Sequence, residues 1–387
     1  MKTKSTWLCL VLIVFFNCSC QQINRKKSFN GQSIVINLDV PAEADIKASK
    51  IFKSVRPIIL ETKQECLIAS VSDVLVFEDN IFLLDKTGKS LFAFNVEGEF
   101  VRRFGRTGLG PGEYSVIFDF TINPIDKEIY MLVDNNTIHV YAINGVYIRS
   151  VRILADNTTH FYSIQYYDGK IYATVQHPGE KDNLLKAIDP KSGKVLKGYF
   201  TPADRKGWNG LPLGSGFFNR AYGIPRYTTH FMNTVVSIDD MNPYIEFESN
   251  NFPTVRQIED ISREITPRQL NAMIQLNKIR GIKCYIENNE WILFLYEYGV
   301  RTVTALYMKN EDKIHIATPY FNDLVHGQGY PLLVNCSDGK GAYEAVRMEQ
   351  FLRYRDLLHE NFDKREQLFA LNEESNPVIF YYEFKDE

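Results

Sequence analysis

The sequence predicts an all-β fold: a six-bladed β-propeller with short helical insertions and a closing blade built from both ends of the chain. Two observations carry this prediction. Residues 91–104 align residue for residue with 138–151, sharing a turn glycine and an arginine four positions later, and a looser third copy occupies 185–200. Hairpin copies spaced by about 40 to 50 residues are typical of radial β-architectures, in which each copy belongs to one blade. The aromatic content of 13% also suits strands.

The first five blades follow one another along the chain as runs of short strands divided by turn residues. We expect them at about residues 70–104, 118–151, 162–200, 234–247 and 281–316. The fourth is the most degenerate, since only its last two strands are clear and an irregular segment rich in glycine and aromatic residues precedes it.

The sixth blade must be assembled from fragments. Its candidate strands are 33–38, 57–60, 331–336, 343–346 and 378–382. Joining the two ends of the chain in one blade closes the ring and removes exposed sheet edges. Two segments break the all-β pattern: 266–274, which begins with a capping Thr and a Pro at the first helical position, and 348–358. We interpret both as helical insertions.

The N-terminus has the pattern of a secretory signal over residues 1–19. Lys2 and Lys4 precede an apolar run over 7–16, which is too short for a bilayer span of about 20 residues. Residues 20–32 follow as a polar, basic tether, and the propeller is expected over 33–387.

The segment Asn17-Cys18-Ser19-Cys20 resembles a bacterial lipobox, which would make Cys20 the acylated first residue of the mature protein. Asn17 departs from the common pattern, and an ordinary cleaved signal with a chance cysteine is the alternative. More than one acyl chain would hold the domain stably on a membrane. Because surface-exported lipoproteins of Bacteroidetes resemble one another in an acidic cluster behind this cysteine, the basic tether favours the outer membrane facing the periplasm, with surface exposure left open.

Net charge and cysteine spacing argue against nucleic-acid binding, a zinc motif and a disulfide framework. Without residues 1–19 the chain has 42 basic and 47 acidic residues, a net charge of −5, which gives no electrostatic case for nucleic acid. Cys66, Cys284 and Cys336 match neither a zinc pattern nor a disulfide framework. We interpret them as buried apolar residues, with one disulfide bond as the alternative.

Three segments, 60–69, 81–85 and 98–114, are similar to the six-bladed β-propeller lipoproteins of Bacteroidetes, relatives of the NHL-repeat propellers. The resemblance covers nearly the whole mature chain, is most specific in the first two blades and weakens over 201–251. It implies the fold and an envelope location. It implies no activity, because the family has none in common.

The loop 105–114 contains four glycines but no Gly-Lys-Ser/Thr ending and no following helix, so it does not fit a phosphate-binding loop. We interpret it as a tight connection between blades whose glycines adopt positive φ. The alternative is that Arg106 and Glu113 line one mouth of the channel and touch a ligand. Asp85 and Asp134, which close equivalent strands, are expected to be turn acceptors.

The long irregular connection 201–227 is the candidate for ligand contact, because binding residues concentrate on long loops of rigid scaffolds. Its aromatic candidates are Trp208, Phe217, Phe218 and Tyr222. Core filling is the alternative use of these rings.

No catalytic or metal-binding residue can be named, because the seven histidines are scattered singly and none has metal-ligand spacing. The function predicted is a membrane-anchored envelope lipoprotein that acts as a non-enzymatic binding or scaffolding propeller for a glycan, peptide or protein partner, without a cofactor. The alternative is a channel-centred, metal-dependent hydrolase or lyase with bound calcium. Whether the chain is an enzyme therefore stays open.

Overall fold

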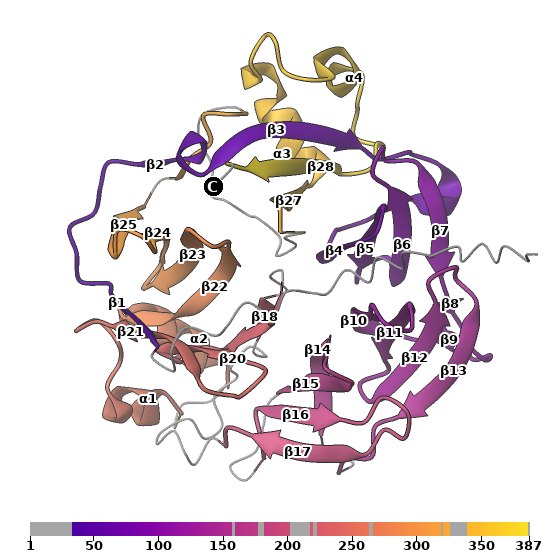
Figure 1. Ribbon diagram of the computed structural model, residues 1–387, viewed down its shortest axis with the longest axis horizontal. Coiled ribbons are helices and arrows are strands. Elements are labelled where there is room, and N and C mark those ends of the chain that lie inside the picture. The colour runs from indigo at the N-terminus through magenta and orange to yellow at the C-terminus, as the bar shows by residue number, and fades with distance from the viewer. Residues whose placement is uncertain are drawn as a thin grey trace, which may run out of the picture. The chain divides into compact units, whose positions relative to one another are not determined.

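A computed structural model describes residues 33–156, 159–176, 182–201, 217–219, 223–262, 266–318, 320–325 and 339–385. The chain divides into two units, 1–33 and 34–387. In the second unit six sheets surround a central axis as the blades of a propeller, which confirms the predicted fold (Figure 1). No helix of the described ranges is long and apolar enough to cross a membrane.

Blades one to three each contain four antiparallel strands, and their successive strands are neighbours. Blade one is β4 (Asp73–Phe77), β5 (Asn80–Asp85), β6 (Ser90–Asn95) and β7 (Phe100–Phe104); blade two is β10 (Ile117–Asn123), β11 (Glu128–Val133), β12 (Thr137–Ala142) and β13 (Tyr147–Arg152); blade three is β14 (His160–Tyr167), β15 (Lys170–Gln176), β16 (Leu185–Ile188) and β17 (Val195–Tyr199). The repeated sequence is the outer hairpin of each blade. Its turn glycines have φ of +95° at Gly98 and +90° at Gly145, a conformation that only glycine adopts without strain.

Blades four and five continue the ring. Blade four is β18 (Phe217–Asn219), β19 (Arg226–Thr228), β20 (Thr234–Ser237) and β21 (Pro243–Glu248); blade five is β22 (Ile279–Glu287), β23 (Trp291–Tyr298), β24 (Arg301–Met308) and β25 (Lys313–Ala317). Blade four has a fifth strand, β1 (Ile34–Asn37), which pairs in parallel with β21. The prediction that 33–38 belongs to the closing blade is therefore wrong. Ile36 and Leu38 are buried with Ile245 and Phe247 instead, and this burial fixes the strand on blade four.

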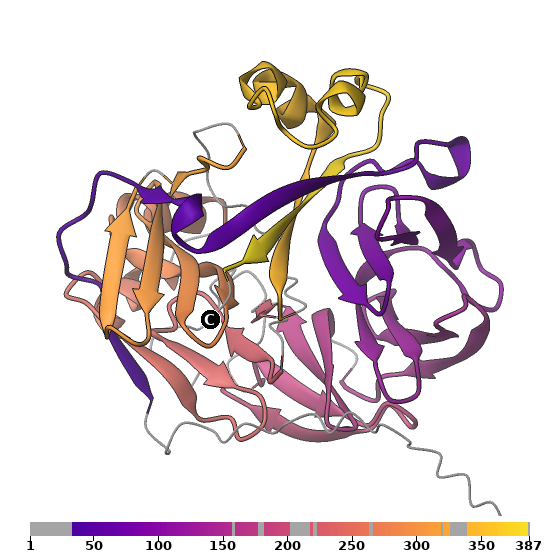
Figure 2. The same ribbon diagram turned by 45° about the horizontal axis from the view of Figure 1, so that its top comes forward.

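Both chain ends do meet in blade six, as predicted. Its strands are β27 (Gly341–Val346), β28 (Val378–Phe384) and β3 (Phe52–Ile59), and β28 pairs antiparallel with both others. The candidate strand 331–336 lies outside the described residues. Figure 2 shows β3 and β28 side by side, with the helices of the same region standing out from the blade. Ring closure therefore depends on main-chain pairing between the two chain ends.

The first residues of the propeller form a strap, which we define as residues 34–51, around the outside of blades four to six (Figure 1). After β1, the amide of Glu43 donates to the carbonyl of Ile316 on blade five. The strand β2 (Ile46–Lys47) then pairs in parallel with β26 (Tyr320–Phe321), before the short 3-10 helix η1 (Ala48–Lys50) leads into β3. The strap links three blades through their outer edges.

Helices are insertions, as predicted. The two expected segments form α2 (Thr266–Gln275) and α3 (Met348–Tyr354), the latter continued by η4 (Arg355–Leu357). The prediction omitted α1 (Val255–Ser262), α4 (Arg365–Phe369) and η2 (Gln64–Cys66). Helix α1 begins at a capping box, because Thr254 and Gln257 exchange hydrogen bonds between side chain and backbone, at 2.9 Å and 3.3 Å.

Candidate functional site

An open groove of about 1050 Å³ lies on blade four, beside α1 and the strap. Its described lining has an apolar part and a polar part, and we refer to the apolar residues as the floor and to the polar ones as the rim. The apolar residues are Phe200, Phe231, Val236, Met241, Pro243, Phe247, Phe252, Pro253, Val255 and Ile258; the polar ones are Asn37, Asp39, Asn233, Thr234, Glu248, Ser249 and Asn250. A groove of this size with an apolar floor is the usual form of a binding site.

The backbone of the groove floor is strained at three positions. Phe200, Phe231 and Met241 have φ of +55°, +57° and +61°. They are the three apolar side chains among the twelve non-glycine residues with left-handed φ in the described part of the chain, and all three line this groove. Each such conformation costs about 1 to 3 kcal/mol, and residues of this kind cluster at ligand-binding sites.

Asp39 of the strap organises the rim. Its carboxylate accepts hydrogen bonds from the Ser249 hydroxyl at 2.5 Å, the Asn250 amide at 2.7 Å and the Asn251 side chain at 3.1 Å. These bonds, led by the Asn250 backbone amide, lower the pKa of Asp39. The strap therefore keeps an ionised carboxylate at the groove and holds the segment between β21 and α1 in place.

The charge at the groove is acidic. Asp39 and Glu248 are the charged side chains among its described lining residues, and no Lys, Arg or His is among them. The two carboxylates give the groove a local potential that favours positive charge.

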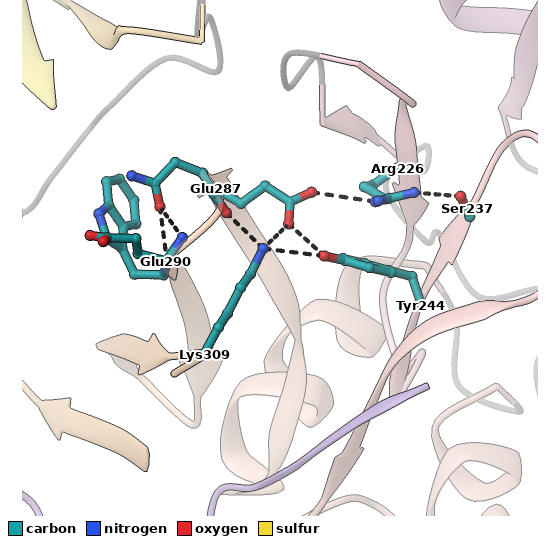
Figure 3. Close-up of polar contacts among 8 residues, drawn as sticks. Arg226, Ser237, Tyr244, Glu287, Glu290 and Lys309 are labelled. Atoms are coloured by element: carbon teal, nitrogen blue, oxygen red, sulfur yellow. Dashed lines mark hydrogen bonds and ion pairs between the residues drawn. The ribbon is translucent and has the colours of Figure 1, made fainter. Parts of the chain in front are cut away.

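A buried network of charges joins blade four to blade five (Figure 3). The Glu287 carboxylate is 3.0 Å from Lys309 Nζ and 3.4 Å from Arg226 Nε, and it accepts a hydrogen bond from the Tyr244 hydroxyl at 2.9 Å. The Arg226 guanidinium stacks over the Tyr244 ring at 3.6 Å. Tyr244 lies at a register shift in blade four, between the pairs Val236–Pro243 and Val235–Ile245.

The chemistry of this network is structural. Burial by itself would raise the pKa of Glu287, but the charges of Lys309 and Arg226 and the bonds from Lys309 and Tyr244 lower it. Burial and the Glu287 carboxylate raise the pKa of Tyr244. The carboxylate bridges two cations and a tyrosine hydroxyl, so the network links β19, β21, β22 and the residue after β24.

The predicted channel-mouth pair lies at the outer rim of the ring instead. Arg106 Nε and Glu113 Oε1 are 2.6 Å apart, on the short parallel strands β8 (Arg106–Thr107) and β9 (Glu113–Tyr114) (Figure 1). The connection packs on the outer half of blade two, since the Tyr141 hydroxyl donates to the Gly112 carbonyl at 2.6 Å. A Cβ on Gly105 would be 2.5 Å from that hydroxyl, so glycine is required there. The structural interpretation of this loop holds.

The predicted aromatic loop is only partly described. Trp208 and Tyr222 lie outside the described residues, and Phe217 and Phe218 belong to the innermost strand β18. The Phe218 side chain is 3% exposed and its ring centroid is 5.8 Å from that of Tyr227. Phe218 therefore fills the core between blades three and four and does not present its ring to a ligand.

The remaining candidates are turn and core residues. Asp85 accepts hydrogen bonds from the amides of Gly88 and Ala69 at 2.7 Å and 2.6 Å, as expected of a turn acceptor. Asp134 accepts from Ser115 and Val116. Cys66 and Cys284 are buried, as expected, and burial raises the pKa of Cys284 to about 12; Cys336 lies outside the described residues. Within the described ranges no three His, Cys, Asp or Glu side chains are close enough to hold a metal ion.

Fold and groove together define a six-bladed β-propeller with an open, acidic and apolar groove on one blade. The chain belongs to the family described as a domain of unknown function, DUF4934, whose model matches residues 33–383. The search among curated proteins gives no match.

Two solved structures from Bacteroides share the fold. A protein of Bacteroides fragilis described as exported is 18% identical, with a TM-score of 0.72 over 92% of this chain and 100% of the other. A member of the DUF4221 family from Bacteroides vulgatus is 12% identical, with a TM-score of 0.50 over 86% of this chain and 99% of the other. At these identities the likeness establishes the fold alone.

Proposed function

We propose that this chain is an envelope lipoprotein that binds a polypeptide segment in the groove on blade four and carries out no chemical conversion there. The bound segment is apolar and is flanked by Lys or Arg. The rigid, closed ring provides the scaffold, and binding residues on such scaffolds sit at loops and edges.

The left-handed conformation of Phe200, Phe231 and Met241 carries this proposal. Met241 stands at the last position of the β20–β21 turn, where the corresponding turn of blade three has Gly193, and the left-handed φ of Phe200 and Phe231 opposes the usual preference of a bulky residue. Phe231 is only 8% exposed and belongs to the core between blades three and four, and Phe200 and Met241 pack against that core, so the three residues fix the shape of the groove wall before a ligand arrives. Preorganisation of this kind reduces the cost of binding.

The lining favours a polypeptide over a glycan. Its rings are Phe side chains, with neither Trp nor Tyr among the described lining residues, and Met and Val complete the apolar surface. Met adapts to varied apolar partners. The Asn and Ser groups at the rim can pair with a peptide backbone, and Asp39 and Glu248 attract basic flanking residues.

Location in the envelope rests on the signal pattern of residues 1–19 and on Cys20 as the lipid-attachment site. The description of the Bacteroides fragilis neighbour as exported agrees with this location. The lipid would hold the propeller on the outer membrane facing the periplasm, with a tether of residues 20–32 between membrane and strap.

A panned library of random dodecapeptides tests the function. We expect enriched peptides with an apolar centre and Lys or Arg on its flanks, and binding that weakens as salt is raised. Val255→Arg places a bulky cation in the groove at a side chain that is 46% exposed, so it should abolish binding without unfolding the protein. Val300→Arg, at an apolar side chain that is 82% exposed on the turn of blade five, is the matched control and should bind as the wild type does.

Equal peptide binding by both variants would contradict the proposed site. Retention of a neutral polysaccharide, with no peptide enriched, would overturn the polypeptide assignment in favour of a glycan.

A further inference from the structure

Glu344 is a buried acid at the seam where the ring closes. It lies on β27, the innermost strand of blade six, and is 8% exposed. The Tyr382 hydroxyl of the C-terminal strand β28 donates to Glu344 Oε2 at 2.5 Å and accepts from Asn322 Nδ2 at 2.8 Å. This chain of hydrogen bonds connects β27, β28 and the segment after β26, and β26 itself holds the strap.

No basic side chain in the described ranges offsets the charge of Glu344. The ionisable groups that face it are Tyr382 on β28, Tyr320 on β26, Tyr354 on α3 and Cys284 on β22, with Asp323 acting on Tyr320. Burial raises the pKa of all three tyrosines and raises that of Cys284 to about 12. These four groups stay neutral between pH 5 and pH 8.

The surroundings of Glu344 are incompletely paired as well. The Tyr320 hydroxyl and Asn322 Oδ1 are buried without a hydrogen-bond partner in the part of the chain that the structure describes. Burial raises the pKa of Glu344 to about 7, against the opposing effect of the bond from Tyr382. A neutral carboxyl group fits this environment, and a carboxylate there lacks compensation.

We propose that Glu344 is a proton-controlled latch on the seam: its neutral carboxyl group lets blade six pack against blade five, and its carboxylate loosens that packing. The effect reaches the aromatic cluster that joins the two blades. The Tyr382 ring is 5.0 Å from Phe52 on β3, and Trp291 of blade five is 4.9 Å from Phe384 on β28. Both chain ends are thus held by groups next to the latch.

Hydrogen exchange measured by mass spectrometry tests the latch on the full mature chain. Protection factors, corrected for intrinsic exchange, should fall for β27 and β28 by up to about tenfold per pH unit as pH rises from 5 to 7, because opening is linked to loss of one proton. Peptides from β11 and β12 of blade two are the internal control and should not change. Glu344→Gln should remove the pH dependence in blade six, whereas Glu349→Gln, at a side chain that is 74% exposed on α3, should retain it.

The latch is overturned if blades two and six show the same pH dependence, or if Glu344→Gln behaves as the wild type. Should Glu344→Gln fail to fold, infrared spectroscopy of the wild type decides. We expect the carbonyl band of a protonated, buried carboxyl group at pH 5 and its loss by pH 8.5; absence of that band at pH 5 would rule the latch out.

Discussion

The side-chain amide of Asn376 donates a 2.8 Å hydrogen bond to the carbonyl oxygen of Glu61, which lies 315 positions earlier in the chain. The same amide donates to the Cys66 carbonyl at 2.9 Å, and its oxygen accepts from the Ile68 amide at 2.9 Å. One buried side chain therefore satisfies three backbone groups of the opposite chain end. Ring closure rests on this clamp as well as on the pairing of β28 with β3.

Replacing Asn376 by Ala should lower the free energy of unfolding by at least about 2 kcal/mol, since the substitution leaves buried donors and acceptors without partners. Urea unfolding measures the change. Asn372→Ala, four residues earlier and making only local turn contacts, should cost much less. Equal losses in the two variants would mean that the clamp does not hold the ring.

Stability should depend on pH through Glu344. The pKa of Glu344 is raised from 4.5 to about 7 in the fold. The contribution of its proton to the free energy of unfolding is therefore complete below pH 4.5 and is lost as pH rises through about 7. Glu344→Gln should therefore be more stable than the wild type at pH 8, by up to about 3 kcal/mol, and no more stable at pH 4.5. Urea unfolding at the two pH values tests this, and a gain of equal size at both would contradict it.

The charge network between blades four and five should be sensitive to loss of its carboxylate. Glu287→Gln leaves Arg226 and Lys309 buried without a counter-charge, and we expect a loss of about 3 to 5 kcal/mol in the free energy of unfolding. Glu78→Gln breaks the exposed pair with Lys127 and should cost under about 1 kcal/mol. A similarly small loss at Glu287 would show that the network does not stabilise the contact between blades.

Lipid attachment predicts a clear fractionation result. Cys20→Ala should leave the protein soluble in the envelope and unlabelled by radioactive palmitate, while the wild type partitions with membranes and is labelled. Membrane partition with palmitate labelling in Cys20→Ala would show that the lipobox interpretation is wrong.

Two parts of the fold could be predicted from the sequence: the repeated outer hairpins, and blade six, whose closure removes exposed sheet edges. The outer hairpins were visible because Gly98 and Gly145 mark the same turn, and blade six followed from the need to pair the last strand. The position of β1 was not predictable, because a four-residue apolar strand fits the edge of any blade. Its place depends on contacts of Ile36 and Leu38 with blade five and with β21.

The candidate site was hidden from the sequence for a physical reason. Positive φ at Phe200 and Phe231 opposes the local preference of each residue, and Met241 stands where the turn of blade three has Gly193, so no residue type marks these positions in the sequence. Glu344 was equally hidden, since an acidic residue in a strand usually faces solvent, whereas both faces of a blade are covered by its neighbours. The long aromatic loop attracted the prediction instead, and its described ring, Phe218, belongs to the core.

The most direct test of the binding groove is photo-crosslinking in the living cell, with benzoylphenylalanine in place of Val255 in the groove or Val300 outside it. The account predicts one discrete protein adduct from position 255 and no such adduct from position 300. The adduct should map to an apolar segment with basic flanks, and it should be lost when Glu248→Lys is added. The same adducts from both positions, or an adduct at 255 that survives Glu248→Lys, would contradict it.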